Sequence, residues 1–139
     1  MKTYVKIALF VVSFIALSAI LAALYMFNLK HTDMSKAKPD YAISATLLLK
    51  AFEDDETAAS NKYINKILEV TGTISSVKPA ENNVLSISLE TESPVSSVIC
   101  TFPAISDPSD IIAGNDITLR GECSGFLMDV LLNNCAEIK

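Results

Sequence analysis

The stretch Lys66-Ile-Leu-Glu-Val-Thr-Gly-Thr-Ile-Ser-Ser-Val77 decides the fold. Its apolar residues Leu68, Val70 and Ile74 alternate with polar ones, which is the period-2 pattern of a strand with one buried face. Gly72 falls on the buried phase, and a glycine inside a strand marks a bend, a bulge or close backbone approach. Because a long strand that bends at its middle can pair in two sheets at once, the pattern predicts the first strand of a small closed barrel.

Four further short strands with the same alternation follow, at 84–90, 95–102, 116–123 and 129–138. Residues 78–83 form a turn-rich connection, and 124–128 are expected to turn the chain between the last two strands. The segment 107–114 has the capping residues of a short helix. Five strands with a short helix between the third and the fourth predict a mainly β protein with an OB-fold barrel.

The sequence of the N-terminal part predicts a membrane anchor. Residues 7–29 carry no charge and lie between Lys6 and Lys30. As a helix at ~1.5 Å per residue they would extend roughly 34 Å, enough to cross a hydrocarbon core of ~30 Å. The apolar region of a cleaved secretory signal is shorter, about 7–15 residues. We therefore expect an uncleaved, single-pass transmembrane helix at 7–29 after a flank at 1–6; the lysines on its two sides do not decide its orientation.

A polar linker is expected at 30–40, followed by the OB-fold domain at 41–139. Ser44 is a good N-cap, and four apolar residues then recur on one helical face: Ala45, Leu48, Leu49 and Phe52. A second short helix is expected at 56–63. The acidic run 53–56 lacks the spacing of a calcium loop and reads as a solvated junction next to a helix N-terminus, so no metal site is predicted.

Charge is distributed unevenly along the chain. The first 39 residues hold five lysines and one acid, whereas residues 40–139 carry a net charge of −9. This asymmetry fits a membrane-proximal start and a solvated domain that repels polyanions.

The chain holds three cysteines, at positions 100, 123 and 135. Single, widely spaced thiols without a histidine in the domain do not match the ligand spacing of a zinc site. A small barrel outside the cytoplasm often carries a disulfide. If the last two strands form a hairpin through 124–128, Cys123 faces about residue 129 and lies roughly 20 Å from Cys135, which is too far. The third and fifth strands are neighbours in an OB barrel, which favours Cys100–Cys135; three free buried thiols are the alternative.

Catalysis finds no support in the residues. The only histidine, His31, lies in the linker, so a nucleophile in the domain has no histidine base. The carboxylates show no spacing that marks an acid–base pair. We expect a non-catalytic protein without a cofactor.

Several short pieces, in order, carry a family resemblance: Leu48-Leu-Lys-Ala-Phe52, Tyr63, Glu69-Val-Thr-Gly72, Cys100-Thr-Phe102, Arg120-Gly-Glu-Cys-Ser-Gly125, Asp129-Val130 and Cys135. Through them, residues 41 to 138 resemble the tRNA-anticodon-binding-like (tRNA_anti-like) OB family of bacterial envelope proteins. The resemblance implies a lipoprotein or an anchored protein, and nucleic-acid binding by analogy of fold. No cysteine follows the apolar run here, so the helix at 7–29 takes the place of a lipid.

OB folds bind ligands on the outer face of the second and third strands and on the adjoining loops. The candidate ligand edge comprises Ser86, Ser88, Ser97, Thr101, Lys78, Asn82, Asn83 and Phe126. Phe126, in the loop between the last two strands, has the alternative reading of a hydrophobic plug. The outward strand positions are neither basic nor aromatic, and a domain of charge −9 neutralises phosphates poorly, so nucleic acid is disfavoured as a partner.

The sequence thus predicts a binding module of the bacterial cell envelope, held in the cytoplasmic membrane with its C-terminal domain outside the cytoplasm. Its partners would be the bilayer, through 7–29, and an unknown protein, glycan or small solute. A single-strand-binding OB protein and a structural subunit of an envelope complex are the alternatives.

Overall fold

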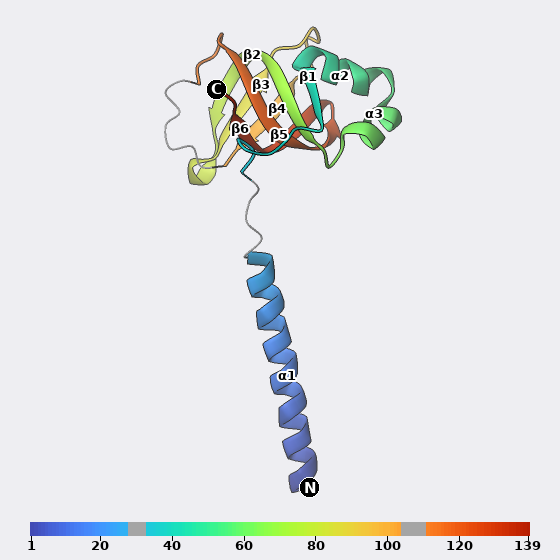
Figure 1. The fold of residues 1–139 in the computed structure, drawn as a ribbon, viewed down its shortest axis with the longest axis vertical. Helices are drawn as coiled ribbons and strands as arrows, with labels where there is room; N and C mark the ends of the chain where they lie inside the picture. Colours follow the sequence, from blue (N-terminus) through green and yellow to red (C-terminus); the bar gives the residue numbers. More distant parts are fainter. Residues whose placement is uncertain (28–32, 104–110) are drawn as a thin grey trace. The chain divides into compact units, whose positions relative to one another are not determined.

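The computed structural model describes residues 1–27, 33–103 and 111–139 (Figure 1). The chain divides into two compact units, Met1–His31 and Thr32–Lys139. Of the predicted short helix at 107–114, residues 107–110 fall outside the described residues, and 111–114 are not helical. Ile112 instead accepts a hydrogen bond from the Asn115 N–H in a turn that includes Gly114 at φ +93°.

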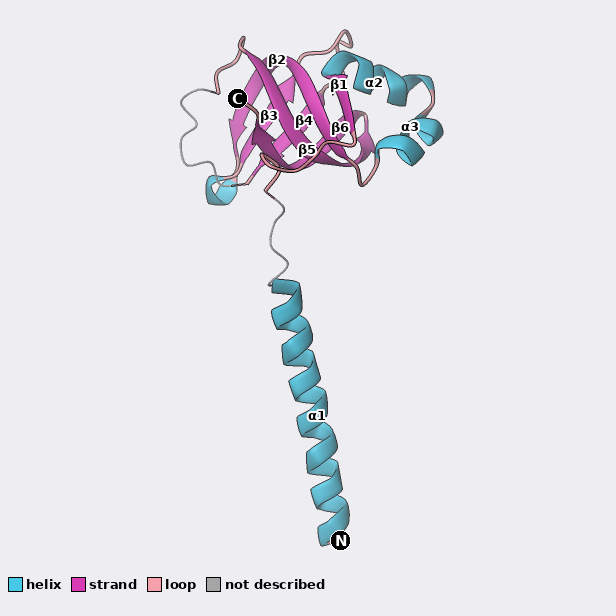
Figure 2. Ribbon diagram, viewed as in Figure 1, coloured by secondary structure: helices cyan, strands magenta, loops and turns pink. Residues whose placement is uncertain are grey.

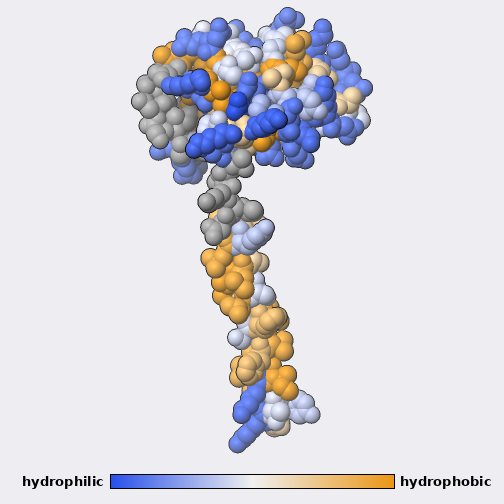
Figure 3. Space-filling model, viewed as in Figure 1, coloured by the Kyte–Doolittle hydropathy of each residue, from blue (hydrophilic) through white to orange (hydrophobic). Residues whose placement is uncertain are grey.

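The first unit is one helix, α1 (Lys2–Phe27), whose side chains are exposed along its length. It is long and apolar enough to cross a membrane. Figure 3 shows apolar residues covering most of it beyond the lysines near its start.

The second unit is a closed five-stranded barrel, as predicted (Figure 2). Its strands are β2 (Ile67–Pro79), β3 (Leu85–Leu89), β4 (Val98–Phe102), β5 (Asp116–Leu127) and β6 (Asp129–Glu137). They pair in the order β2-β3-β4-β6-β5, and β5 closes the ring on β2. The β4–β6 pair is parallel and the other pairs in the ring are antiparallel.

The long strand β2 pairs on two sides, as its sequence indicated. Residues Ile67–Thr73 pair with β5, and Ile74–Pro79 pair with β3. The change of partner coincides with an irregularity between Ile74 and Ser76, just after Gly72. Gly72 itself allows close approach, because a Cβ there would lie 3.1 Å from the Cβ of Ala45.

A sixth strand, β1 (Tyr41–Ser44), pairs in parallel with β2 and was not predicted. The two predicted helices are present as α2 (Ala45–Asp54) and α3 (Glu56–Tyr63). Ser44 caps α2 by accepting a hydrogen bond from the Leu47 N–H at 3.3 Å, and Asp55 caps α3 through the Ala58 N–H at 2.9 Å. The apolar stripe of α2 is fully buried in the core of the barrel.

Three strand boundaries differ from the predicted ones by two residues or more. β2 continues through Lys78 and Pro79, which were expected in the connection at 78–83. β4 begins at Val98 rather than at residue 95, because the N–H of Ser97 is bound by the Asp129 carboxylate at 2.7 Å. β5 continues to Leu127, so 124–128 do not form the predicted turn. The chain reverses at Met128, which has φ 66°. As a result, Cys123 is paired with Leu132 and not with residue 129.

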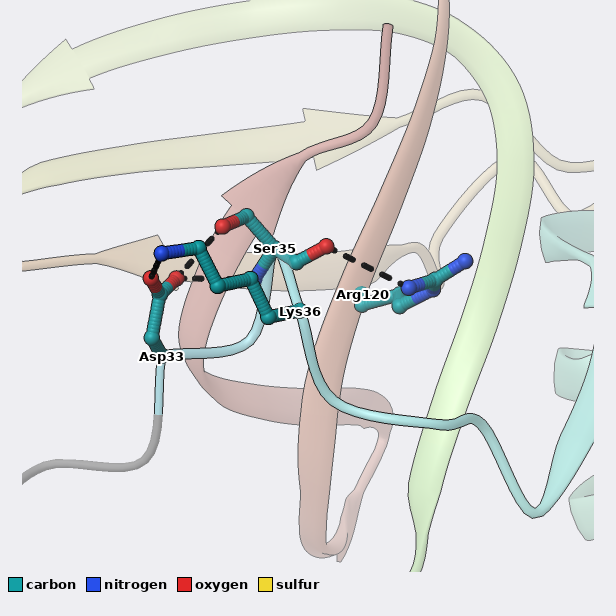
Figure 4. A network of polar contacts seen from close by, with 4 residues as sticks. All are labelled: Asp33, Ser35, Lys36 and Arg120. Carbon is teal, nitrogen blue, oxygen red and sulfur yellow. Dashed lines mark hydrogen bonds and ion pairs between the residues drawn. The ribbon is translucent and has the colours of Figure 1, made fainter.

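Residues 33–40, part of the predicted linker, lie on the outside of the barrel. The guanidinium of Arg120 donates to the carbonyl oxygen of Ser35 at 3.4 Å (Figure 4). It also donates to the carbonyl oxygen of Ala37 at 2.9 Å. Arg120 also forms an ion pair with Glu69, with 2.7 Å between Nη2 and Oε2. Further along, the carboxylate of Asp40 accepts a hydrogen bond from the Ile67 N–H at 2.9 Å.

Candidate functional site

Three of the predicted ligand residues form a row across neighbouring strands. Ser86 on β3 is paired with Lys78 on β2 and with Thr101 on β4. Side chains at paired positions lie on the same face of a sheet. Ser86 and Thr101 are half-buried and Lys78 is exposed, so the row combines two hydroxyls with one cation on the outer face of the barrel.

The loop between β2 and β3 lies at one end of this row. It contains the short 3-10 turn Glu81–Asn83, in which Asn82 and Asn83 both have φ 60°. Asparagine tolerates this left-handed conformation better than most residues. Both side chains are exposed, so their amides can donate and accept hydrogen bonds next to the row.

A second row continues toward the other end of the face. Ser88 is paired with Ser76 on β2 and with Ile99 on β4. Next to it, the β3–β4 loop encloses an open hollow of about 410 Å³. Its lining is polar and rich in hydroxyls: Ser75, Ser76, Ser88, Glu90, Thr91, Ser93, Pro94, Val95, Ser96 and Ser97. We call it the hydroxyl hollow.

Three of the hydroxyls in the hydroxyl hollow bind the protein itself. Ser75 donates to the carbonyl oxygen of Ser88 at 3.0 Å, and Thr91 donates to that of Ser96 at 2.6 Å. The Ser97 hydroxyl lies 3.0 Å from the Asp129 carboxylate. Within the described part of the chain, four hydroxyls make no hydrogen bond: those of Ser76, Ser88, Ser93 and Ser96.

Glu90 is the charged residue in this lining, which includes no basic and no aromatic side chain. The free hydroxyls can donate to and accept from an uncharged polar ligand. The hollow lacks the cations that hold phosphate groups and the aromatic platforms on which bases stack.

The sequence model of the tRNA_anti-like family matches residues 1–137. The chain belongs to the tRNA_anti-like family. The predicted resemblance is therefore confirmed, and its span includes the apolar N-terminal helix. No curated protein sequence matches the chain.

Two solved structures resemble this chain to different degrees. A proposed nucleic acid-binding lipoprotein from Klebsiella pneumoniae superposes with a TM-score of 0.60 at 16% identity, covering 70% of this chain and 91% of that one. A proposed aspartyl-tRNA synthetase from Leishmania major gives a TM-score of 0.45 at 8% identity, covering 73% of this chain and 21% of that one. At these identities the likeness concerns the fold alone.

Phe126, expected at the ligand edge, lies elsewhere in this tRNA_anti-like domain. Its ring stacks on Phe52 of α2, with 5.3 Å between centroids and 25° between planes. It is half-buried and packs against the core, in agreement with the alternative reading of Phe126 as a hydrophobic plug. The other seven predicted residues lie along the β2–β4 face or in its loops.

A second hollow, of about 570 Å³, was not predicted from the sequence. It lies at the ends of β1 and β6 and at the start of β5, and its lining includes Gly72, Asp116 and Glu137. Asp116 accepts a hydrogen bond from the Thr73 hydroxyl at 2.6 Å. A side chain at Gly72 would meet Ala45 and Leu89, so the glycine does not account for this hollow, and the alternation of the strands gives no signal for it.

The three cysteines are free, buried thiols in this structure. Burial raises the pKa of Cys100 well above its usual value, and the hydrogen-bonded Cys135 thiol raises it further. Burial also raises the pKa of Cys123, to about 11, against a hydrogen bond from the Gly125 backbone that lowers it. Such thiols stay protonated and react slowly at neutral pH. Among the described residues, no group of three His, Cys, Asp or Glu side chains could hold a metal.

Proposed function

We propose that this chain is a membrane-anchored, non-catalytic binding module of the bacterial cell envelope, and that the β2–β4 face with the hydroxyl hollow holds its partner. The observation that carries the proposal is the set of four unpaired hydroxyls gathered in one hollow. Hydroxyls without protein partners can exchange their bonds to water for bonds to a ligand at little cost.

The chemistry of the lining selects the class of partner. With Glu90 as its charged group, the hydroxyl hollow favours an uncharged or weakly cationic polar ligand, such as a glycan or a polar protein segment or solute. Phosphate-rich ligands would meet the net charge of −9 on residues 40–139.

Anchoring is supported by the 26 residues of α1 and by their exposed apolar side chains. We place the C-terminal domain outside the cytoplasm, with α1 as a single span of the cytoplasmic membrane. The lipoprotein named among the similar structures is consistent with a family that works at a membrane surface.

Site-specific photo-crosslinking in cells tests the binding surface. A photoreactive phenylalanine replaces Ser93 in the hollow, and the matched control carries it at the exposed Thr57 of α3. We expect a discrete adduct from position 93 that disappears when Ser88→Arg is added, and no such adduct from position 57. Identical adducts from both positions, or none from position 93, would refute the assignment.

Single-stranded nucleic acid is the second candidate, favoured by the name of the Klebsiella pneumoniae protein and by Lys78 in the first row. Fluorescence anisotropy of a labelled oligonucleotide with the full chain in detergent distinguishes the two. We expect flat titrations at low salt. Salt-sensitive binding that Lys78→Ala weakens would establish the nucleic-acid function instead.

A structural role in an envelope complex predicts a different result. Partners captured by crosslinking would then be lost when α1 is exchanged for an unrelated transmembrane helix. Under the binding proposal they are retained in that exchange and lost with Ser88→Arg.

A further inference from the structure

We propose that Leu127 and Met128, at the turn of the β5–β6 hairpin, and Val95 of the β3–β4 loop insert together into an apolar pocket with a basic rim on a partner protein. We call these three residues the apolar tip. The inference goes beyond the proposed function and does not depend on it, because Leu127 and Met128 lie outside the lining of the hydroxyl hollow.

The side chains of the apolar tip are open to solvent. Leu127 is 80% exposed, Met128 68% and Val95 74%. A single exposed apolar residue is ordinary on a protein surface, whereas several that lie together mark an interaction site. The argument for a site therefore depends on whether the loop and the hairpin are held side by side.

Hydrogen bonds hold the β3–β4 loop against the hairpin. The carboxylate of Asp129 accepts a hydrogen bond from the Ser97 N–H at 2.7 Å, and the Val130 N–H donates to the Ser97 carbonyl oxygen at 3.1 Å. Val95 precedes Ser97 by two residues, and Asp129 directly follows the turn of the hairpin. The three exposed side chains are therefore neighbours at one end of the barrel.

Met128 has a backbone conformation that an apolar residue rarely adopts. Its φ is 66°, in the left-handed region that glycine and asparagine tolerate best. In the described part of the chain, the other non-glycine residues with positive φ are all asparagines, at positions 65, 82, 83 and 134. Methionine at this turn is unfavourable for the backbone, and its exposed side chain makes no compensating burial within the domain. Such an outlier indicates a side chain that is used outside the domain.

Carboxylates predominate around the β3–β4 loop. Glu90 and Glu92 belong to the loop and are exposed. The loop lies beside α2 (Figure 1), where Glu53 and Asp54 line a hollow of about 220 Å³ together with Glu92 and Lys50. Four carboxylates against one ammonium group make this end of the barrel negative.

Shape and charge together select the partner. A protruding apolar residue fits a concave pocket, and anchors of this kind contribute much of the affinity of protein interfaces. The acidic neighbours favour basic groups at the rim of that pocket. A nucleic acid, an anionic lipid surface or the same end of a second copy would each bring like charges together.

Photo-crosslinking of the full chain in cells tests the apolar tip. A photoreactive phenylalanine replaces Leu127, and the matched control carries it at Ile112, which is 57% exposed and precedes the other end of β5. We expect a discrete protein adduct from position 127 that is at least tenfold stronger than any from position 112. Mass spectrometry of the adduct should place the crosslink next to lysine or arginine residues of the partner.

Substitutions separate binding from folding. Met128→Asn suits φ 66° and removes the apolar side chain, so it should weaken the adduct at least fivefold without lowering the melting temperature. Met128→Leu keeps an apolar side chain and should retain the adduct. Glu92→Lys should weaken it at least fivefold, whereas the control Glu81→Lys, in the exposed β2–β3 loop, should not.

Ser88→Arg, which tests the hydroxyl hollow, should leave the adduct from position 127 in place, so the two proposals fail separately. No adduct from position 127, or equal adducts from positions 127 and 112, would overturn the inference. So would an adduct that Met128→Asn leaves unchanged, or one formed with lipid or with a second copy of the chain.

Discussion

Adding one methyl group at Gly121 tests the packing inside the β5–β6 hairpin. The new Cβ of Gly121→Ala would lie 2.5 Å from Cys135 Sγ and 3.2 Å from the Asn133 carbonyl oxygen. Comfortable contacts between such heavy atoms begin at about 3.5 Å, so the sulfur would have to move by about 1 Å in a packed interior. Overpacking of this kind costs about 1–3 kcal/mol. We expect a loss near the upper end, about 2–3 kcal/mol, because a backbone oxygen blocks the other direction.

A double-mutant cycle assigns this loss to the sulfur. Cys135→Ala removes Sγ and is expected to cost about 1–2 kcal/mol, as a small buried deletion does. If the clash with Sγ dominates, the double variant loses at least about 1 kcal/mol less than the sum of the single losses. The remaining contact with the Asn133 oxygen makes the rescue incomplete.

Urea unfolding of the full chain in mild detergent with reductant, followed by far-UV circular dichroism, measures these free energies. Gly125→Ala is the matched control, since Gly125 also lies in β5 and a Cβ there would meet nothing within 4 Å. That variant should stay within about 0.5 kcal/mol of the wild type. Equal stability of the two alanine variants, or strict additivity in the cycle, would show that the sulfur does not fill the space at Gly121.

Three further predictions concern other parts of the domain. Arg120→Ala should loosen residues 35–37 from the barrel, raising their amide hydrogen exchange and lowering the free energy of unfolding by about 1–3 kcal/mol, and Arg120→Lys should restore little of it. The pKa of Cys123 is raised to about 11 in the folded state, so the thiol favours folding below pH 9 and this advantage is lost as pH rises toward 11. Unfolding free energy should then fall by at most about 1.4 kcal/mol per pH unit for this thiol, and Cys123→Ser should flatten the curve; an unchanged curve would contradict the assignment. A reporter active only outside the cytoplasm, fused after Lys139, should be active, and a silent reporter would reverse the proposed orientation.

The parts of the fold that were predicted correctly depend on strict periodicity. In β2 the alternation and Gly72 indicated a strand shared by two neighbours, and in α2 the apolar stripe indicated a buried face. The outward positions of Ser86 and Thr101 followed from the same alternation, whereas Lys78 was expected in the connection after the strand and lies in β2. β1 could not be found in this way, because Tyr41–Ser44 has no alternation of its own and is a strand only through its parallel pairing with β2.

Bulges explain where the periodic reading of the site failed. Between Cys123 and Gly125 the register shifts by one residue, so Ser124 is the extra residue of β5. The inward phase of β5 then changes from odd to even positions, and Phe126 packs against α2 instead of facing a ligand. The sequence indicated a turn at 124–128 and therefore a loop position for Phe126, because the alternation gives no signal for an inserted residue that lets the strand continue with its faces exchanged.

The same reasoning applied to β6 links the packing of the hairpin to the location of the candidate surface. Its bulge at Asn134 sends Cys135 inward over Gly121, just as the bulge in β5 sends Phe126 inward onto Phe52. Both strands therefore give the core the side chains that strict alternation would have left at the surface. The β5–β6 hairpin therefore packs against α2 through Phe126 and closes the ring by pairing β6 with β4. Polar groups without protein partners are left on the opposite arc, where the irregularity of β2 and the β3–β4 loop form the hydroxyl hollow.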